Sequence, residues 1–452
     1  MQESKKLSLS SYLMVGSLLF GLFFGAGNLI FPVHMGQLAG TNVGAATIGF
    51  LITATGLPFL GVVALAMTNS SSLFQLASRV HPIYAYLMTI ALYLTIGPFF
   101  ATPRLGTTSF EVGFAQHIPE RFQTVGLAVF TITFFSVALL LSLKPTKILV
   151  YVGKVLNPLF LLFLGLLILF AFFKPMGSVA NEMPDPSYVS GAFNNGFLEG
   201  YNTMDALASL AFGVIVVQTI KGLGVTKPAD IAKDTIKAGF ISVVLMAIIY
   251  ACLAYIGTMS TGTFAVSENG GIALAQIAHH YFGGFGSFLL AIIVTLACLK
   301  TAIGLITAGA ETFYQLFPHS FSYRTYVVLF SAVSCLAANV GLTNIIAYSL
   351  PVLMFLYPLA IVLILMAILS PLFKNRQIVY VTTTMFTLLV SAADFLHYLP
   401  SFISEQDWAQ KVLAFYSRYV PLFDIGMGWL IPSLIGFILG WLLSLLVKKK
   451  PS

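Results

Sequence analysis

Three charged residues stand inside long apolar runs: Asp205, Lys300 and Arg104. In a membrane, a charge at the centre of a helix costs about 3 kcal/mol on insertion scales unless it finds a partner or water. Such residues mark substrate sites, ion pathways or proton relays. The sequence therefore predicts functional sites around these three residues.

A fourth segment, GLFFGAGNLIFP at residues 21–32, combines Gly25, Gly27, Asn28 and Pro32. Glycine and proline weaken a helix, and backbone groups released in hydrocarbon must find partners. Transporters use such breaks to present amides to a substrate carboxylate and carbonyls to an amine or a cation. We expect a functional break here; the alternative is a packing notch for a neighbouring helix.

Residues 205–213, DALASLAFG, offer a partner for this break. Asp205 supplies the charge, while Ser209 and Gly213 supply a hydroxyl and a weak point in the helix. The alternative is that Asp205 lies close to the outer water, as Glu199 and Asn202 would allow. Two broken spans at corresponding positions fit two inverted repeats with a site at mid-membrane between them.

Lys300 lies near the centre of an apolar run, in ACLKTAIG at residues 297–304. Two functional roles follow: a tethered cation that stands in for a sodium ion, or a proton carrier. The alternative is a lysine that reaches an internal water cavity or pairs with a carboxylate for structure alone.

Arg104 and Glu111 lie in a segment with two prolines and several hydroxyls. Seven residues separate them, which places both on one helix face. We expect a shared polar seam, either as a gate or as a structural ion pair. Asp394, near His397, is expected to face protein or the outer surface.

The elements that position these residues are membrane helices. The chain has 452 residues, of which 58% are hydrophobic and 8% charged, against about 25% charged in soluble proteins. Because a span needs about 20 apolar residues, the predicted fold class is all-α: a polytopic membrane protein with about twelve transmembrane helices. The two corresponding breaks and this span count together predict a 5+5 inverted repeat plus two extra helices. The spans are placed at residues 11–36, 44–68, 82–115, 122–142, 147–172, 191–220, 235–259, 285–316, 324–340, 344–371, 377–400 and 423–447.

These spans divide the chain into a first repeat (1–172), a second repeat (173–371) and two additional spans (372–452). The connection at 260–284 contains a predicted helix, Gly271 to Tyr281, which we interpret either as a cover over an access path or as an ordinary surface loop. No nucleotide loop, metal cluster or nucleophile elbow is present in the sequence. We therefore expect no enzyme activity and no cofactor beyond a coupling ion.

The positive charges predict the orientation. Of the 22 Lys and Arg residues, sixteen fall in one set of alternating connections and four in the other, with Arg104 and Lys300 inside spans. Cytoplasmic loops carry the excess of such residues. The prediction is a multi-pass membrane protein with both termini in the cytoplasm; the net charge of +7 then reflects orientation and not binding to nucleic acid.

Three segments resemble a known family: LFGLFFGAGNLIFP in the first span, ATPRLGTTSFE at residues 101–111, and residues 297–304. The chain resembles the bacterial branched-chain amino acid:cation symporters over nearly its whole length. This resemblance implies import of leucine, isoleucine and valine, driven by sodium or protons, and the broken-helix fold of the amino-acid:sodium symporters. It also implies a place in the bacterial cytoplasmic (inner) membrane.

That fold also implies roles for single residues. In the first break, Gly25, Ala26, Gly27 and Asn28 would bind substrate, with the amides of Ala26 and Gly27 on its carboxylate. Carbonyls near Gly21 and Phe24 would face a cation, so that a sodium ion is expected at Gly21, Phe24 and Thr301. In the sixth span, Ala206, Leu207 and Ser209 would meet the substrate amine and Phe212 its aliphatic side chain.

One position departs from the pattern. Sodium-coupled members of the fold have two adjacent hydroxyls on the eighth span, where this chain has Lys300 and Thr301. A lysine ammonium there competes with sodium, which favours proton coupling or a fixed internal cation; alternatively, Lys300 points elsewhere. The sequence thus predicts an alternating-access importer, with a same-fold symporter for another solute, or a channel, as rivals.

Overall fold

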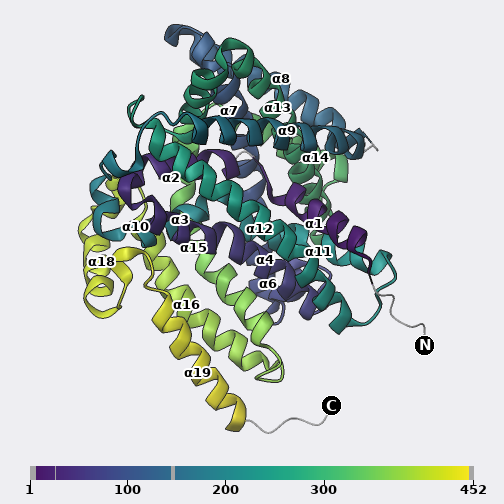
Figure 1. The fold of residues 1–452 in the computed structure, drawn as a ribbon. Helices are drawn as coiled ribbons and strands as arrows, with labels where there is room; N and C mark the ends of the chain where they lie inside the picture. Colours follow the sequence, from purple (N-terminus) through teal and green to yellow (C-terminus); the bar gives the residue numbers. More distant parts are fainter. Residues whose placement is uncertain (1–6, 26, 144–147, 447–452) are drawn as a thin grey trace.

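The computed structural model describes residues 7–25, 27–143 and 148–446, and every regular element in these ranges is a helix (Figure 1). Eight stretches are long and apolar enough to cross a membrane, and four shorter apolar helices accompany them. Each of the twelve predicted spans contains one of these elements. The predicted class, an all-α polytopic membrane protein, is confirmed.

Four of the spans consist of two helices each, and eight consist of one. The paired helices are α1 (Leu9–Phe23) with α2 (Gly27–Ala39), α3 (Val43–Leu51) with α4 (Leu57–Met67), α6 (Pro82–Leu94) with α7 (Ala101–Gly113), and α10 (Pro186–Glu199) with α11 (Asp205–Gly222). The single helices are α8 (Glu120–Leu143), α9 (Ile148–Phe173), α12 (Pro228–Ser260), α13 (Gly270–Leu316), α14 (Tyr323–Ala338), α15 (Leu342–Leu369), α16 (Gln377–His397) and α19 (Leu430–Leu446). Short helices in the connections are α5 (Leu73–Ala77), α17 (Ser401–Ser404) and α18 (Asp407–Tyr419).

The interruptions differ in kind. The second span keeps its helical path through a wide π-type turn at Ile52–Gly56, and the third span is bent at Thr95–Phe99, where Gly97 is non-helical (φ −89°, ψ −120°) and Pro98 follows. Proline and wide turns are ordinary causes of such bends. The first and sixth spans instead break completely, and this difference matters for the site.

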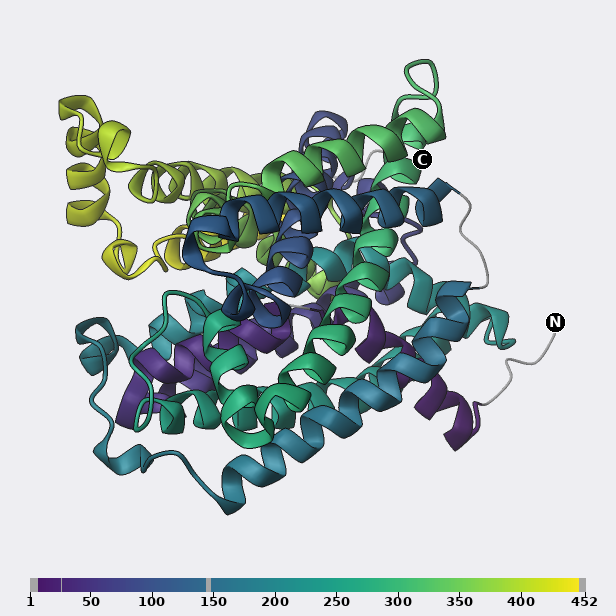
Figure 2. The same ribbon diagram turned by 90° about the horizontal axis from the view of Figure 1, so that it is seen from above.

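The central bundle is made by helices from both halves of the chain. Helix α2 packs against α12, α4 against α11, and α7 against α13. Helix α16 packs on α15 and on α19, along one edge of the molecule (Figures 1 and 2). The two broken spans therefore meet inside the bundle, and the sixth span also contacts the segment before α19, where Asn194 donates to the Ile425 carbonyl.

The helix predicted at Gly271 to Tyr281 exists as the first part of α13. Asn269 caps it by accepting from the amides of Gly271 and Ile272. The chain turns at Gly283, which has a positive φ of 61° that suits glycine. The first part of α13 packs so closely on α2 that a Cβ on Gly270 would meet the carbonyl of Ile30.

Candidate functional site

The first span breaks between Phe23, the last residue of α1, and Gly27, the first of α2. Phe24 is extended (φ −72°, ψ 99°), and the amide of Gly25 donates to the Asn28 Oδ1 at 2.7 Å. The start of α2 thus has free amide groups, and a helix N-terminus favours a negative charge. The predicted break is confirmed at its glycines; Ala26 lies outside the described residues.

The sixth span breaks at a 3₁₀ turn, η6 (Gly200–Thr203), followed by Met204 in the left-handed region (φ 61°, ψ 12°). Helix α11 begins directly afterwards with Asp205. The prediction that Gly213 is the weak point of this span was wrong, and the hydroxyl of Ser209 lies outside the break as well. Both lie within the continuous α11, where Gly213 packs against α4.

One buried polar cluster joins the two breaks. Asn28, Asp205 and Tyr250 are 2%, 3% and 0% exposed. The Asn28 amide donates to the Asp205 carboxylate and to the Tyr250 hydroxyl, and that hydroxyl lies 3.5 Å from the same carboxylate. Asp205 is therefore an interior residue, and the alternative that it lies close to the outer water is excluded.

A cavity opens beside this cluster, between the two breaks and the third and eighth spans; we call it the Asp205 cavity. It carries a carboxylate and a guanidinium in an otherwise mostly apolar wall. Its lining residues are Leu22, Phe23, Gly25, Gly27, Asn28, Ile96, Ala101, Arg104, Leu105, Thr203, Met204, Asp205, Ala208, Phe212, Thr301 and Leu305.

The cavity includes Phe212 as predicted, but three other predicted residues of α11 do not line it. Ala206, Leu207 and Ser209 point elsewhere, because the break lies at 200–204 and sets Ala208 and Phe212, one turn apart, on the cavity face. The Ser209 hydroxyl donates to the Ala206 carbonyl and lies against Gly61 of α4. The direct contacts expected between these three side chains and a substrate amine are not supported by this geometry.

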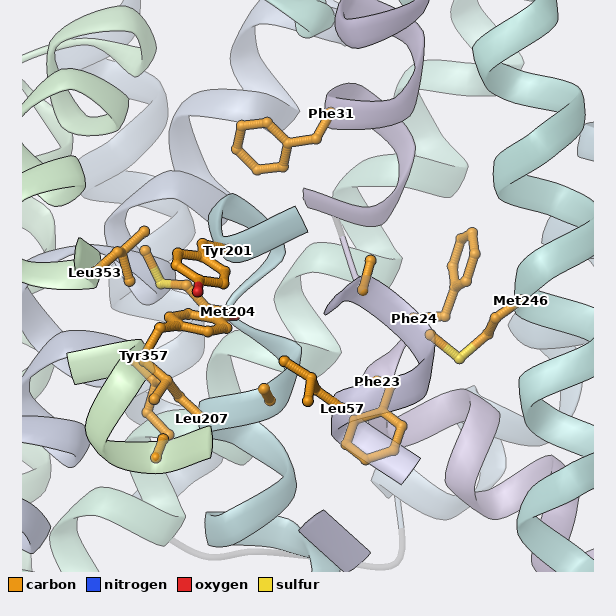
Figure 3. Close-up of a cluster of buried hydrophobic side chains, with 14 of the residues drawn as sticks. Phe23, Phe24, Phe31, Leu57, Tyr201, Met204, Leu207, Met246, Leu353 and Tyr357 are labelled. Atoms are coloured by element: carbon orange, nitrogen blue, oxygen red, sulfur yellow. The ribbon is translucent and has the colours of Figure 1, made fainter. Parts of the chain in front are cut away.

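A second cavity, the Lys300 cavity, lies on the other side of Gly25. The Lys300 ammonium is 3.4 Å from the carbonyl oxygen of Gly21, one of the two carbonyls expected to face a cation. Phe24 also lines this cavity and stacks on Phe20. Figure 3 shows that Phe24 and Tyr201 lie on opposite sides of the break in the first span. Lysine therefore reaches the place where the sequence predicted a cation.

Thr301 is the next residue on α13, and its side chain turns to the other cavity. Its hydroxyl donates to the Ala297 carbonyl at 3.1 Å, and its methyl lies 3.8 Å from the position of a Cβ on Gly25. Lys300 and Thr301 thus face the two cavities on either side of the first break.

Arg104 and Glu111 do not form the ion pair that their spacing suggested. The Arg104 guanidinium donates to the Asn202 carbonyl at 2.7 Å and lies 4.8 Å from the centre of the Phe31 ring. Glu111 lies further along α7, beside Gly271 of α13. Arg104 is held by the break in the sixth span, so it belongs to the central site, and Glu111 does not contact it.

Tyr250 and Met204 were missed by the sequence analysis. Tyr250 could not be recognised as a site residue from sequence, because tyrosine is common in apolar helices and only its hydroxyl is polar. Met204 has a left-handed backbone that non-glycine residues seldom adopt. A signal did exist upstream, because Gly200, Asn202 and Thr203 are poor helix formers.

This arrangement is that of the broken-helix membrane transporters, as solved structures show. The nucleobase-cation-symport family transporter Mhp1, in a closed conformation with bromovinylhydantoin bound, has a TM-score of 0.63 at 13% identity, covering 96% of this chain and 92% of Mhp1. MhsT, in complex with L-phenylalanine, has a TM-score of 0.56 at 15% identity, with 96% and 99% covered. These likenesses concern the fold.

The family follows from sequence. A family model described as branched-chain amino acid transport protein matches residues 8–447. The branched-chain amino acid permeases BrnQ of Lactobacillus delbrueckii subsp. lactis and of Bacillus subtilis are 45% and 43% identical, each over 99% of both chains. A branched-chain amino acid transport system carrier protein of Pseudomonas aeruginosa is 39% identical over 97% of both. The chain belongs to the branched-chain amino acid transport protein family, whose members are transporters.

Proposed function

We propose that this protein imports leucine, isoleucine and valine by alternating access, driven by an inward cation gradient. The observation that carries this proposal is the Asp205 cavity, where two broken spans meet through the Asn28–Asp205 hydrogen bond. Broken spans at a central site are the device by which such transporters bind a solute from one side and release it on the other. The names of the relatives support the substrate class.

The two ends of an amino acid have distinct partners in this cavity. The start of α2 at Gly27 suits the substrate carboxylate, because a helix N-terminus offers amides and a partial positive charge. The Asp205 carboxylate suits the ammonium, in place of the predicted contacts with α11 side chains. The amino acid would then lie between the breaks, where a rearrangement of either one changes its access.

The aliphatic side chain would lie against Phe212, Ile96 and Leu305, which line the same cavity. Burying one methylene is worth about 0.8 kcal/mol. Pockets separate substrates that differ by one methylene by only about 1 to 3 kcal/mol. We therefore expect weak discrimination among leucine, isoleucine and valine, with each competing for uptake of the others.

The position of Lys300 supports a fixed internal cation. Its ammonium lies against the Gly21 carbonyl, where the resemblance implied sodium. A positive charge there would repel sodium, so we propose that the proton is the coupling ion. Sodium at Gly21, Phe24 and Thr301 is the alternative, and it requires Lys300 to move away.

Uptake of labelled leucine into proteoliposomes tests both parts. A proton or a sodium gradient is imposed separately, for the native protein and for Lys300→Thr. Proton-driven uptake by the native protein, with sodium dependence appearing in the variant, is the expected result. Sodium-driven uptake by both proteins would show that Lys300 does not occupy the cation site. An absence of leucine uptake under either gradient would reject the substrate.

A further inference from the structure

The strongest feature outside the central site is a buried carboxylate at the interface between α16 and the bundle. Asp394 is 1% exposed, and among the described residues neither of its carboxylate oxygens has a hydrogen-bond partner. An unpaired charge in a protein interior is so unfavourable that the group normally gains a partner or a proton. A residue in this position calls for a physical explanation.

Other buried polar atoms surround it and are also unsatisfied. The Tyr201 hydroxyl and the Trp429 indole N–H lie within reach of each other, yet neither makes a hydrogen bond of normal geometry in the described structure. Asp394 interacts electrostatically with Tyr201 and with Tyr398. Three different segments thus turn polar groups toward one enclosed spot.

The chemistry of these neighbours selects the ligand. An indole N–H is a donor only, and a tyrosine hydroxyl both donates and accepts. A metal cation would need several oxygen ligands and would be repelled by the indole N–H. A carboxylate that alternates between a protonated form, which donates, and an ionised form, which accepts, suits the hydroxyls of Tyr201 and Tyr398, while the Trp429 N–H suits the Tyr201 hydroxyl.

Among the described residues, the two helices packed along α16 offer Asp394 no fixed charge. Helices α15 and α19 contain no charged residue within their bounds, and His397 meets the rings of Tyr398 and Phe423 edge to face. The titratable groups that face Asp394 are therefore Tyr201 and Tyr398. The charged residues of α18 and of the adjoining loops are exposed: Glu405, Asp407, Lys411, Arg418 and Asp424.

Tyr201 connects this spot to the central site. Its ring stacks on Tyr357, with centroids 4.0 Å apart and planes inclined by 16° (Figure 3). Tyr357 lies beside Thr203 and interacts electrostatically with Asp205. Tyr201 and Thr203 both belong to η6, so the neighbours of Asp394 include a residue of the segment that forms the break.

We propose that Asp394 is a proton-binding residue of the transport cycle, linked through Tyr201 and Tyr357 to the break in the sixth span. This proposal rests on the proposed function, which it extends by assigning a proton site to the added helices. Protonation at Asp394 and binding at Asp205 would then favour the same arrangement of η6, and such coupling is reciprocal.

The test uses the full-length protein in lipid and three variants: Asp394→Asn, Tyr201→Phe and the control Ser391→Ala. Ser391 lies one turn away on α16, is equally buried and bonds only within its helix, to the Thr387 carbonyl. Infrared spectra recorded across a pH series follow the carbonyl stretch of protonated carboxyl groups without any substrate. Leucine counterflow and accumulation driven by a pH gradient are measured in parallel.

We expect one titrating carboxyl band to be missing from Asp394→Asn and kept in Ser391→Ala. Tyr201→Phe should shift the midpoint of that band and of leucine accumulation together. Asp394→Asn should keep counterflow but lose gradient-driven accumulation by about tenfold, within the usual range of coupling between two sites.

Three results would overturn the proposal. One is a full set of carboxyl bands in Asp394→Asn; another is proton-driven accumulation that neither variant changes. The third is native accumulation that requires sodium and is lost in Asp394→Asn without any missing band, which would make Asp394 a cation ligand. If native protein moves no leucine, the proposed function fails, while the infrared series still decides whether Asp394 binds a proton.

Discussion

Asn28 is the residue on which the two breaks depend. Its Oδ1 accepts from the Gly25 amide in the first break, and its Nδ2 donates to Asp205 at the start of α11. Removing it would take one hydrogen bond from the buried Asp205 carboxylate and the acceptor from the Gly25 amide, at about 1 to 3 kcal/mol for each group. We predict that Asn28→Ala reduces leucine uptake by at least tenfold at unchanged protein level in the membrane.

Tyr250→Phe is the matched comparison. It removes one hydroxyl that bonds to the same Asn28 amide and leaves the link between the breaks in place. We expect a smaller loss of uptake, with the apparent affinity for leucine changed more than the maximal rate. Equal losses in both variants would show that the whole cluster, and not Asn28, holds the breaks together.

Single residues differed in how well sequence predicted them. Asn28, Asp205 and Lys300 stood out because a polar group in an apolar run is costly. The register of α11 was not predictable, because it depends on the left-handed Met204. Without that residue's backbone, nothing in the sequence shows that Ala208, and not Ser209, faces the cavity.

At the scale of elements, α2 and α12 cross in unusually close contact. A Cβ on Gly36 would lie 1.9 Å from the Ala254 carbonyl oxygen, and one on Gly257 would lie 2.0 Å from the Val33 carbonyl oxygen. Small residues permit such approach between membrane helices. We predict that Gly257→Ala lowers the thermal midpoint in detergent, since forcing atoms into a packed interface costs about 1 to 3 kcal/mol.

Gly165→Ala in α9 is the control for that experiment. A Cβ there would have no atom within 4 Å apart from its own helix. Alanine should then leave stability unchanged or raise it by about 0.5 to 1 kcal/mol, because glycine is the poorer helix former. If Gly165→Ala lowered the thermal midpoint as much as Gly257→Ala, the loss in Gly257→Ala could not be assigned to the close approach of α2 and α12.

Helix α10, the first half of the sixth span, begins at a cap whose strength depends on pH. The Ser187 hydroxyl and amide donate to Asp185 at 2.7 and 3.0 Å, and these bonds hold the pKa of Asp185 below its usual value. A carboxylate of this kind stabilises the folded state above its unfolded pKa, and the contribution is lost as pH falls through the folded pKa.

We predict that Asp185→Ala lowers stability at neutral pH by no more than about 1 kcal/mol, as for other exposed N-caps. The difference from native protein should vanish in acid. Thermal unfolding of both proteins at neutral and acidic pH measures it. A difference that persists in acid would assign the effect to packing and not to the charged cap.

Sequence predicted the first break more accurately than the second, for reasons visible in these elements. Two glycines and an asparagine mark the first, and glycine is the residue that a helix tolerates least after proline. The second break is made by Gly200–Thr203 and Met204, while the more conspicuous Ser209 and Gly213 stay helical. Tertiary packing against α4 decides that difference.

At the scale of the whole molecule, helix contacts support the division into two halves. The pair α2 and α12 joins the first span to the seventh, and the pair α11 and α4 joins the sixth to the second. Likewise α1 contacts α12, and α10 contacts α3. Exchanging residues 1–172 with 173–371 turns each pair into the other, as two repeats would require; that the repeats are inverted stays a prediction.

The connections between spans gather on two faces, and an even number of spans places both termini on the same one. On one face, Arg79 donates to the Asn375 side chain at 2.7 Å, and Lys221 donates to that of Asn69 at 2.8 Å. These residues come from three connections that the charge distribution places in the cytoplasm.

On the other face, Asn194 donates to the Ile425 carbonyl at 2.6 Å, and Tyr281 to the Lys174 carbonyl at 2.7 Å. In Figure 1 the start of α1 lies on the right and the end of α19 lies at the bottom, whereas α10 and α18 lie on the left. The grouping by contact agrees with the grouping by charge, although the two are independent.

The orientation itself is a prediction, and two exposed residues test it: Lys227 at the start of α12 and Asp424 before α19. With the native cysteines replaced, an impermeant maleimide applied to intact cells should label Asp424→Cys but not Lys227→Cys, and permeabilised cells should show both. Labelling of Lys227→Cys alone would place both termini outside. Labelling of both in intact cells would contradict the even alternation on which the inverted repeat depends, since the two residues would then share one side of the membrane.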